Sequence, residues 1–444
     1  MMFEPFLIEP DETLARRNVE RLVQRNRQAI GEGGPANEIG SVGIVGAGMM
    51  GVSIAAAHLA HEMPVVVTDA DETVLAALID RIAAELAQQT GATLDNAMST
   101  VARLARATAS DREVAACDLV LETVVESLSV KRAVYRRLEP RLRPDALLAT
   151  NTSTIPVSRL SEGLARPSRF CGIHFFHPVR HRSLVEVVRG ERTGDAATVA
   201  AARHARSIGK MPIVVRDGPG FAVNRLLVRY LSEALEMLLE GATIAQIEEA
   251  ATWFGMAMGP LRAIDEIGME TTLLAGRQLW DAFPERIAPS PLVVTMVKRG
   301  RLGRKSGRGF FAYDRPTAWD GPGEPDPTVE QLIAQWAGAP KPLCREEMAA
   351  RLILPMVVEA TLLLEERKVC DPRDVDLAVV FGLGFPARRG GLLYWVDQVG
   401  AGPIVAMLRS LDSLGPRARP TALLLEAART GRRLYDGLPP GLAR

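Results

Sequence analysis

The sequence predicts an α/β protein in which a mostly parallel sheet with helices on both faces is followed by a region built only of helices. Two observations predict the sheet. Short apolar, β-branched runs alternate with helix-patterned stretches from residue 41 to about residue 217, and a glycine-rich turn follows the first run. Such alternation is typical of parallel sheets covered by helices. A third observation predicts the helical region, because long apolar-faced helices replace the strand-like runs after Asp217.

The expected elements follow one another in a regular order. The run that starts at Ser41 should be the first strand, and the apolar stretch 53–60 after the glycines should be helical. Further helices are expected over 71–89 and 221–240, the second one after the glycines and proline of 217–220 end the preceding element. The other strand candidates are 65–69, 118–122, 146–151, 170–176, 184–188 and 212–215.

The chain has 444 residues, which is too long for one ordinary domain. A helix-patterned stretch and a loose glycine-containing segment precede the sheet, and a stretch rich in Pro and Gly, typical of a linker, interrupts the helical region. The sequence therefore predicts five segments: an amino-terminal helical extension or linker at 1–40, a nucleotide-binding α/β domain at 41–217, a helical domain at 218–314, a linker at 315–342 and a second helical domain at 343–444.

The two helical domains are expected to be copies of one another. An apolar helix, an acidic turn, a Phe-Gly pair and a closing Asp-x-x-Gly recur in the same order. The matched pairs are Glu233 and Glu359 (359 − 233 = 126), Phe254 and Phe381 (381 − 254 = 127), and Asp265 and Asp397 (397 − 265 = 132). Two copies are too few for a solenoid, so a duplicated helical domain is the better interpretation.

The composition is that of a globular protein, with 47% hydrophobic and 24% charged residues. Lys+Arg and Asp+Glu both number 53, so the net charge gives no reason to expect nucleic acid or a membrane surface as the partner. The four cysteines are far apart and form no C-x-x-C pair, which favours a reducing compartment. No apolar run reaches the roughly 20 residues of a membrane span, and the start lacks the pattern of a signal peptide. A cytoplasmic protein is expected.

Residues 46–51 form a G-x-G-x-x-G motif between the first strand and a helix, as in Rossmann-type dinucleotide sites. Glycines there permit a tight turn and a close approach of the backbone to a pyrophosphate at the helix amino terminus. Asp69 ends the next strand 18 residues after the last glycine (69 − 51), where a carboxylate binds the ribose 2′-OH and disfavours a 2′-phosphate. NAD is therefore the expected cofactor. The expected contacts in the turn are Gly46, Gly48, Met49, Met50 and Gly51.

Four further segments resemble the signatures of the (S)-3-hydroxyacyl-CoA dehydrogenase family. They are NTS (151–153), GIHFFHP (172–178), LVEVV (184–188) and DGPGFAVNR (217–225). The resemblance covers most of residues 41–313. The duplicated carboxyl-terminal half is similar to the end of the multifunctional fatty-oxidation α subunits. The 40 residues before Ser41 are too few for the hydratase domain of those proteins, so no such domain is expected in this sequence.

The resemblance implies a role for each matched residue. His174 would be the general base that takes the proton of the substrate's 3-hydroxyl group, and Glu186 would hold its imidazole in the right tautomer. Ser153 and Asn224 would hydrogen-bond the reacting oxygen and position substrate and nicotinamide. The remaining cofactor contacts would be Glu126, Lys131, Asn151 and Ser153. Nothing in the second helical copy answers P-G-F-x-x-N-R, so no second active site is expected.

One residue departs from the family pattern. His177 stands where the family usually has Asn in H-F-F-N-P. His174, His177 and His181 together could be read as metal ligands, but no helical pattern aligns the three rings and no cysteine or carboxylate is adjacent. No metal is expected. The more plausible consequence is a change in the wall of the substrate pocket or in its response to pH.

Alternative functions remain open at this level. The chain could be a non-catalytic NAD-binding or structural protein on the same fold, or an NAD-dependent dehydrogenase of a hydroxy acid without CoA. The basic, glycine-rich stretch 298–309 could bind phosphates of CoA or could be a structural turn. The expected partner is an acyl-CoA thioester. Family members with one helical domain dimerise through it, so the chain is expected to be a monomer with an internal pseudo-dimer, or a homodimer. A separate hydratase or thiolase partner is a further hypothesis.

Overall fold

The computed structural model describes Phe3, Phe6 and residues 8–29, 38–314, 323–339 and 341–439. The chain divides into two compact units, residues 21–221 and residues 222–444 together with 1–20. We call them the nucleotide-binding unit and the helical unit.

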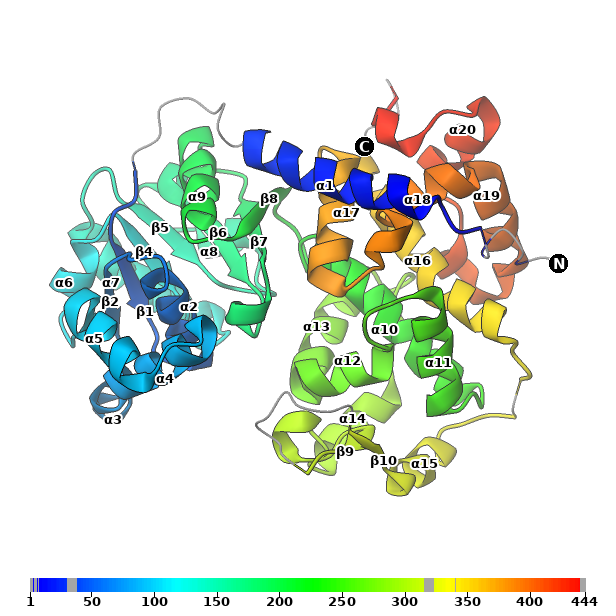
Figure 1. The fold of residues 1–444 in the computed structure, drawn as a ribbon, viewed down its shortest axis with the longest axis horizontal. Helices are drawn as coiled ribbons and strands as arrows, with labels where there is room; N and C mark the ends of the chain where they lie inside the picture. The colour runs from blue at the N-terminus through cyan, green and yellow to red at the C-terminus, as the bar shows by residue number, and fades with distance from the viewer. Residues whose placement is uncertain are drawn as a thin grey trace. The chain divides into compact units, whose positions relative to one another are not determined.

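The nucleotide-binding unit contains an eight-stranded sheet with the order β3-β2-β1-β4-β5-β6-β7-β8 (Figure 1). All neighbouring strands are parallel except β6 and β7, which are antiparallel. The order reverses between β1 and β4, and ligands of doubly wound sheets bind at the carboxyl ends of the strands at such a point. The strands are β1 (Val42–Val45), β2 (Val65–Thr68), β3 (Ala105–Ala107), β4 (Leu119–Glu122), β5 (Leu147–Thr150), β6 (Phe170–Phe175), β7 (Leu184–Arg189) and β8 (Met211–Arg216).

Helices cover both faces of the sheet because the strands are apolar on both sides. One face packs against α2 (Met49–Leu59), α4 (Leu78–Thr90), α5 (Leu94–Leu104) and α9 (Asp195–Ser207) through a continuous buried cluster that includes Ile44 and Ile173. The other face carries α6 (Asp111–Ala115), α7 (Leu128–Leu138) and α8 (Val157–Leu160). There the ring of Phe170 lies 5.1 Å from that of Tyr135, and Gly172 leaves room for Val157.

The predicted strands of the sheet are confirmed, and β3 is an addition. β3 has the sequence Ala-Arg-Ala, which has no β-branched residue and is too short to show a pattern, so only its pairing with β2 makes it a strand. The single helix expected over 71–89 is two helices, α3 (Glu72–Ala76) and α4, which are separated at Ala77. The amino-terminal helix is α1 (Glu12–Ala29).

The helical unit is built around two long neighbouring helices, α10 and α16 (Figure 1). Its helices are α10 (Val223–Leu239), α11 (Ile244–Phe254), α12 (Pro260–Ile267), α13 (Met269–Ala282), α14 (Pro291–Lys298), α15 (Pro327–Ala334), α16 (Arg345–Glu365), α17 (Pro372–Leu377), α18 (Leu392–Val399), α19 (Ala401–Ser410) and α20 (Ala422–Thr430). The predicted linker contains α15 and β10 (Glu324–Pro325), and β10 pairs with β9 (Phe311–Ala312). Residues 315–322 and 340 of that linker lie outside the described residues.

The two halves of the helical unit repeat the same hydrogen bonds at matched positions. Asp265, in α12, accepts hydrogen bonds from the backbone amides of residues 310 and 311, both at 2.9 Å. Its predicted match Asp397, in α18, accepts from the amides of residues 434 and 435 at 2.7 and 3.1 Å. In each half a buried carboxylate thus ties the third helix to the last segment, as expected of duplicated domains.

No single helix in the described part of the chain has the length and hydropathy needed to cross a membrane. Taken together, the segments 387–399 and 401–410 have the length and composition of a membrane span, but they are bent by 92° at the break between them.

Candidate active site

The glycine-rich turn joins β1 to α2 and has the shape that a dinucleotide requires. Gly46 has a φ of +108°, and a Cβ on Gly51 would lie 1.9 Å from the carbonyl oxygen of Gly46. A Cβ at Gly48 would meet nothing within 4 Å. The outer glycines are therefore required for the turn itself, whereas the middle one leaves open space beside the amino terminus of α2, where a pyrophosphate fits.

Asp69 lies next to this turn at the end of β2. Its Oδ2 accepts a hydrogen bond of 2.6 Å from the amide of Ala47, and its Oδ1 accepts one of 3.0 Å from the amide of Asp71. Arg81 of α4 holds the other side of the turn through the carbonyl oxygen of Ala47, at 2.9 Å. The structure thus brings the predicted glycines and the predicted ribose-binding carboxylate together.

A buried carboxylate, Glu122, ends β4 at the same edge of the sheet. Its side chain is 0% exposed. It accepts hydrogen bonds from Lys131 Nζ at 2.8 Å, Tyr135 Oη at 2.6 Å and Thr150 Oγ1 at 2.9 Å. Burial raises the pKa of Tyr135, and the adjacent Glu122 carboxylate raises it further. We call these four residues the Glu122 network. Sequence reasoning missed three of them, although a glutamate closing an apolar strand is a usable signal.

Glu126 connects this network to the loop after β5. Its Oε2 lies 3.2 Å from Lys131 Nζ. Its Oε1 accepts hydrogen bonds from the loop 152–155: the hydroxyl groups of Thr152 and Thr154 (2.7 Å for the latter) and the amides of 153 and 154, at 3.2 and 3.0 Å. Burial acts to raise the pKa of Glu126, but the Lys131 ammonium and the hydroxyl groups outweigh it, so the pKa is lowered. Glu126 is therefore an ionised anchor that fixes the backbone around Ser153.

Asn151 begins that loop and faces the next strand. Its Oδ1 accepts a hydrogen bond of 2.8 Å from the amide of Phe175, the last residue of β6. The loop that contains Ser153 is thereby fixed relative to the strand that contains His174.

His174 and Glu186 are direct partners across the antiparallel pair of β6 and β7. Directly opposite residues in such a pair have side chains in contact, and the 12-residue separation places these two in register. The distance from His174 Nδ1 to Glu186 Oε2 is 2.7 Å, and the two residues are 5% and 0% exposed. A carboxylate at Nδ1 selects the tautomer with the proton on Nδ1, so Nε2 has its lone pair available for a substrate proton.

Aromatic rings enclose the imidazole. The ring of Phe176 lies 4.4 Å from that of His174, and the ring of Phe221 lies 5.7 Å away. Within the described residues, the only hydrogen bond of the His174 ring is the one to Glu186. The imidazole therefore has a fixed orientation, apolar walls and one nitrogen available for chemistry.

The histidines that follow do not join His174 in a cluster. Desolvation lowers the pKa of His177; Glu85 opposes this effect, and Arg180 and Arg182 add to it. His181 Nε2 accepts a hydrogen bond of 3.2 Å from Arg180. No group of three or more metal-ligating side chains converges among the residues that the structure describes.

Two predicted features lie in the helical unit. Asn224 is half-buried in the first turn of α10. Three cations of the basic stretch 298–309 are paired with carboxylates: Arg301 with Asp326 at 2.8 Å, Arg304 with Glu266 at 2.6 Å, and Lys305 with Glu270. This pairing supports the interpretation of the stretch as a structural turn.

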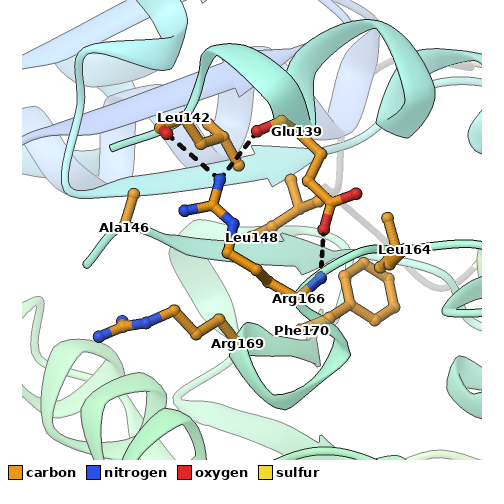
Figure 2. A pocket seen from close by; sticks show the side chains of 8 residues that line it. All are labelled: Glu139, Leu142, Ala146, Leu148, Leu164, Arg166, Arg169 and Phe170. Atoms are coloured by element: carbon orange, nitrogen blue, oxygen red, sulfur yellow. Dashed lines mark hydrogen bonds between the residues drawn. The ribbon is translucent and has the colours of Figure 1, made fainter. Parts of the chain in front are cut away.

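A small pocket lies at the opposite edge of the sheet, beside the starts of β5 and β6 (Figure 2). Arg166 fills one side, with its guanidinium 2.9 Å from the carbonyl oxygen of Glu139 and 3.2 Å from that of Leu142. The carboxylate of Glu139 accepts hydrogen bonds from the amides of Ala165 and Arg166 at 2.9 and 2.8 Å. These contacts stabilise a loop far from the strand ends that hold His174.

The nucleotide-binding fold and the imidazole–carboxylate pair at its carboxyl edge define the class of NAD-dependent dehydrogenases. Comparison with known families agrees. The model of the 3-hydroxyacyl-CoA dehydrogenase NAD-binding domain matches residues 41–218, and that of the 3-hydroxyacyl-CoA dehydrogenase C-terminal domain matches 220–313 and 348–435. The chain belongs to the 3-hydroxyacyl-CoA dehydrogenase family.

Solved structures give the same result. 3-hydroxybutyryl-CoA dehydrogenase from Escherichia coli K12 is 25% identical, with a TM-score of 0.76 and coverage of 88% of this chain and 99% of that chain. The dehydrogenase part of multifunctional enzyme 1 from C. elegans is 26% identical, with a TM-score of 0.63 and coverage of 88% and 90%. (S)-3-hydroxybutyryl-CoA dehydrogenase PaaH1 from Ralstonia eutropha is 32% identical, with a TM-score of 0.59. The match covers 63% of this chain and 100% of that chain.

Proposed function

We propose that this chain interconverts (S)-3-hydroxyacyl-CoA and 3-oxoacyl-CoA with NAD, using His174 as the acid–base group. The observation that carries the proposal is the buried 2.7 Å hydrogen bond from His174 Nδ1 to Glu186. Alcohol oxidation requires one base and one hydride acceptor, and an imidazole held in a single tautomer provides the base without a metal.

His174 Nε2 takes the proton of the 3-hydroxyl group as the hydride leaves C3, and the resulting imidazolium is stabilised by the Glu186 carboxylate. The apolar walls of Phe176 and Phe221 limit the access of water to the ring. Ser153 and Asn224 hydrogen-bond the reacting oxygen and orient the substrate. In the reverse direction the imidazolium returns the proton to the oxygen.

NAD, when bound, supplies the hydride acceptor. The residues that would hold it are the turn 46–51 at the pyrophosphate, Asp69 at the ribose, and Asn151 and Ser153 on the anchored loop near the nicotinamide. Glu126 and Lys131 belong to the same site, and their 3.2 Å ion pair supports the loop. The fit rests on the open space at Gly48 and on the position of Asp69 beside the turn.

The related structures act on CoA thioesters by name, and this supports an acyl-CoA as the substrate and fatty-acid β-oxidation or short-chain acyl-CoA metabolism as the setting. We further propose a monomer, because the second helical copy packs on the first within one chain through α10 and α16. Light scattering of the purified protein tests this, and a stable dimer would contradict it. A cytoplasmic location and a hydratase or thiolase partner belong to the same proposal.

The test is oxidation of NADH in the presence of acetoacetyl-CoA and then a longer 3-oxoacyl-CoA, with wild type beside His174→Ala. Loss of the base should lower kcat by about 10³-fold, while the affinity for NADH stays within about twofold. His181→Ala is the control, since His181 accepts a hydrogen bond from the neighbouring Arg180 and is not part of the His174–Glu186 pair, so the variant should keep kcat within about twofold.

Retention of turnover in His174→Ala would exclude the general-base role. Absence of turnover in a wild-type protein that binds NADH would favour the non-catalytic alternative. If the protein oxidised hydroxy acids without CoA as fast as CoA thioesters, the result would favour the alternative of a dehydrogenase for non-CoA hydroxy acids.

A further inference from the structure

The two long helices of the helical unit exchange arginine–glutamate pairs with internal symmetry. Arg225 of α10 contacts two glutamates of the second copy, with Nε 2.6 Å from Glu359 and Nη1 2.7 Å from Glu366. Arg351 of α16 contacts two glutamates of the first copy, with Nη2 3.3 Å from Glu233 and Nη1 2.6 Å from Glu240.

The two sets match residue by residue at one offset. The differences are 351 − 225 = 126, 359 − 233 = 126 and 366 − 240 = 126. Each arginine is 2% exposed, and the outer glutamates are similar too, with Glu366 at 20% and Glu240 at 19%. A reciprocal pattern of this kind is the signature of a two-fold interface, contained here in one chain.

The symmetry is broken at the residue before each arginine. Asn224 precedes Arg225 in the first turn of α10, whereas the position 126 residues later holds Ala350. The second copy therefore keeps the arginine of the P-G-F-x-x-N-R signature without its asparagine. It keeps the arginine–glutamate contacts that fix the helix, but it has no asparagine next to the arginine that could bind a substrate.

We propose that Glu359 and Glu366 of the second copy are positioning residues for the substrate-binding Asn224, acting through Arg225. This rests on the role proposed above for Asn224. Asn224 and Arg225 are consecutive residues in the first turn of α10, so contacts that hold Arg225 also restrict the backbone that carries Asn224. The planar guanidinium of Arg225 is held by two carboxylates, which limits the movement of this turn one residue from Asn224.

The charges favour the same assignment. Burial acts to lower the pKa of Arg225, but Glu359 and Glu366 outweigh it, so the pKa is raised. Burial acts to raise the pKa of Glu366, but Arg225 and Arg286 lower it overall. Arg225 and Glu366 are therefore both charged at neutral pH, and removing the charge of Glu366 loosens the arginine while Glu359 still contacts it.

The symmetry supplies the matched control. Glu366→Gln and Glu240→Gln remove the same charge from equivalent arginines, and each glutamate has a second cation nearby, Arg286 at 3.1 Å and Lys341 at 3.8 Å. We expect Glu366→Gln to lower kcat/KM for acetoacetyl-CoA about 10-fold, and Glu240→Gln to change it less than about twofold. Both should lower Tm by the same few degrees, about 2–4 °C.

A double mutant separates positioning from general destabilisation. In an Asn224→Ala background, Glu366→Gln should cause no further loss of kcat/KM, because nothing remains to be positioned. Should Glu366→Gln fail to fold, Arg225→Lys and Arg351→Lys form a second pair, since lysine cannot bridge two carboxylates as arginine does.

Equal effects of Glu366→Gln and Glu240→Gln on kcat/KM, or additive losses in the double mutant, would overturn the positioning role while leaving the dehydrogenase assignment intact. A wild-type protein that turns over no 3-oxoacyl-CoA would instead overturn the proposed function, and the positioning role with it.

Discussion

Two buried glutamates on the same face of the sheet have opposite surroundings. Glu122 and Glu186 are both 0% exposed. The carboxylate of Glu122 accepts hydrogen bonds from the side chains of Lys131, Tyr135 and Thr150. Glu186 faces His174, whose second ring nitrogen makes no hydrogen bond among the described residues.

The difference shows how one residue type takes two roles in one site. A buried carboxylate with a full set of donors is a fixed charge that supports neighbouring backbone. A buried carboxylate that binds one side of an imidazole passes its influence to the other side of the ring, where a proton can move. The Glu122 network should therefore control stability, and the His174–Glu186 pair should control turnover.

The largest effect is expected from Glu122→Gln. Loss of the charge leaves Lys131, 1% exposed, with only part of its compensation, and breaking a buried ion pair costs about 3 kcal/mol of unfolding free energy. Chemical denaturation of the variant beside wild type measures this. Unchanged stability together with a large loss of turnover would remove the proposed contrast between the two glutamates.

Glu186→Gln should have the converse effect. A neutral amide can still hydrogen-bond Nδ1 but neither selects the tautomer as firmly nor stabilises the imidazolium, so kcat should fall about 10²-fold. The free energy of unfolding should change less than in Glu122→Gln. Steady-state kinetics and denaturation on the same preparation decide between this outcome and a purely structural Glu186.

A third buried polar pair, on the other face of the sheet, carries no charge at neutral pH. His58 Nε2 lies 2.9 Å from His204 Nε2, and His58 Nδ1 lies 2.6 Å from the carbonyl oxygen of Ile54. Burial lowers the pKa of His58 from 6.5 to about 4, against the opposing effect of that carbonyl. Because the folded-state pKa is lower, the unfolded chain binds the proton first, so stability is complete above about pH 6.5 and declines as the pH falls towards 4.

We expect a loss of about 2 kcal/mol between pH 6.5 and about pH 5 for this group. Denaturation as a function of pH measures the slope. His58→Gln should reduce it, and an unchanged slope would show that other groups cause the acid sensitivity.

The smallest effect is expected at His177, which replaces the family's asparagine. Desolvation lowers its pKa, so the ring is neutral at pH 7 and resembles an amide in charge. His177→Asn should therefore change kcat/KM less than about threefold at pH 7 and above, with any larger difference confined to acidic pH, where the histidine becomes charged. A pH profile of both proteins would contradict this if the difference were largest at alkaline pH.

Several features could be predicted from the sequence because they depend on local pattern. The strands of the parallel sheet follow from apolar runs, and the glycine turn followed by Asp69 follows from a motif whose spacing reflects one strand and one helix. β3 could not be predicted, since three residues without β-propensity become a strand only by pairing with β2. The break at Ala77 in the helix expected over 71–89 could not be predicted either, because no proline or glycine marks it in the sequence.

The sequence by itself determined the class of the protein, the duplication of its helical domain and the pairing of His174 with Glu186, because these depend on motifs and spacings along the chain. The tertiary structure decided what those residues contact. Residues 126 apart become reciprocal partners across α10 and α16, and Glu122 gathers donors from two other elements. The physical reason is that buried charges are stabilised by partners brought together through packing, and such partners need share no spacing in the chain.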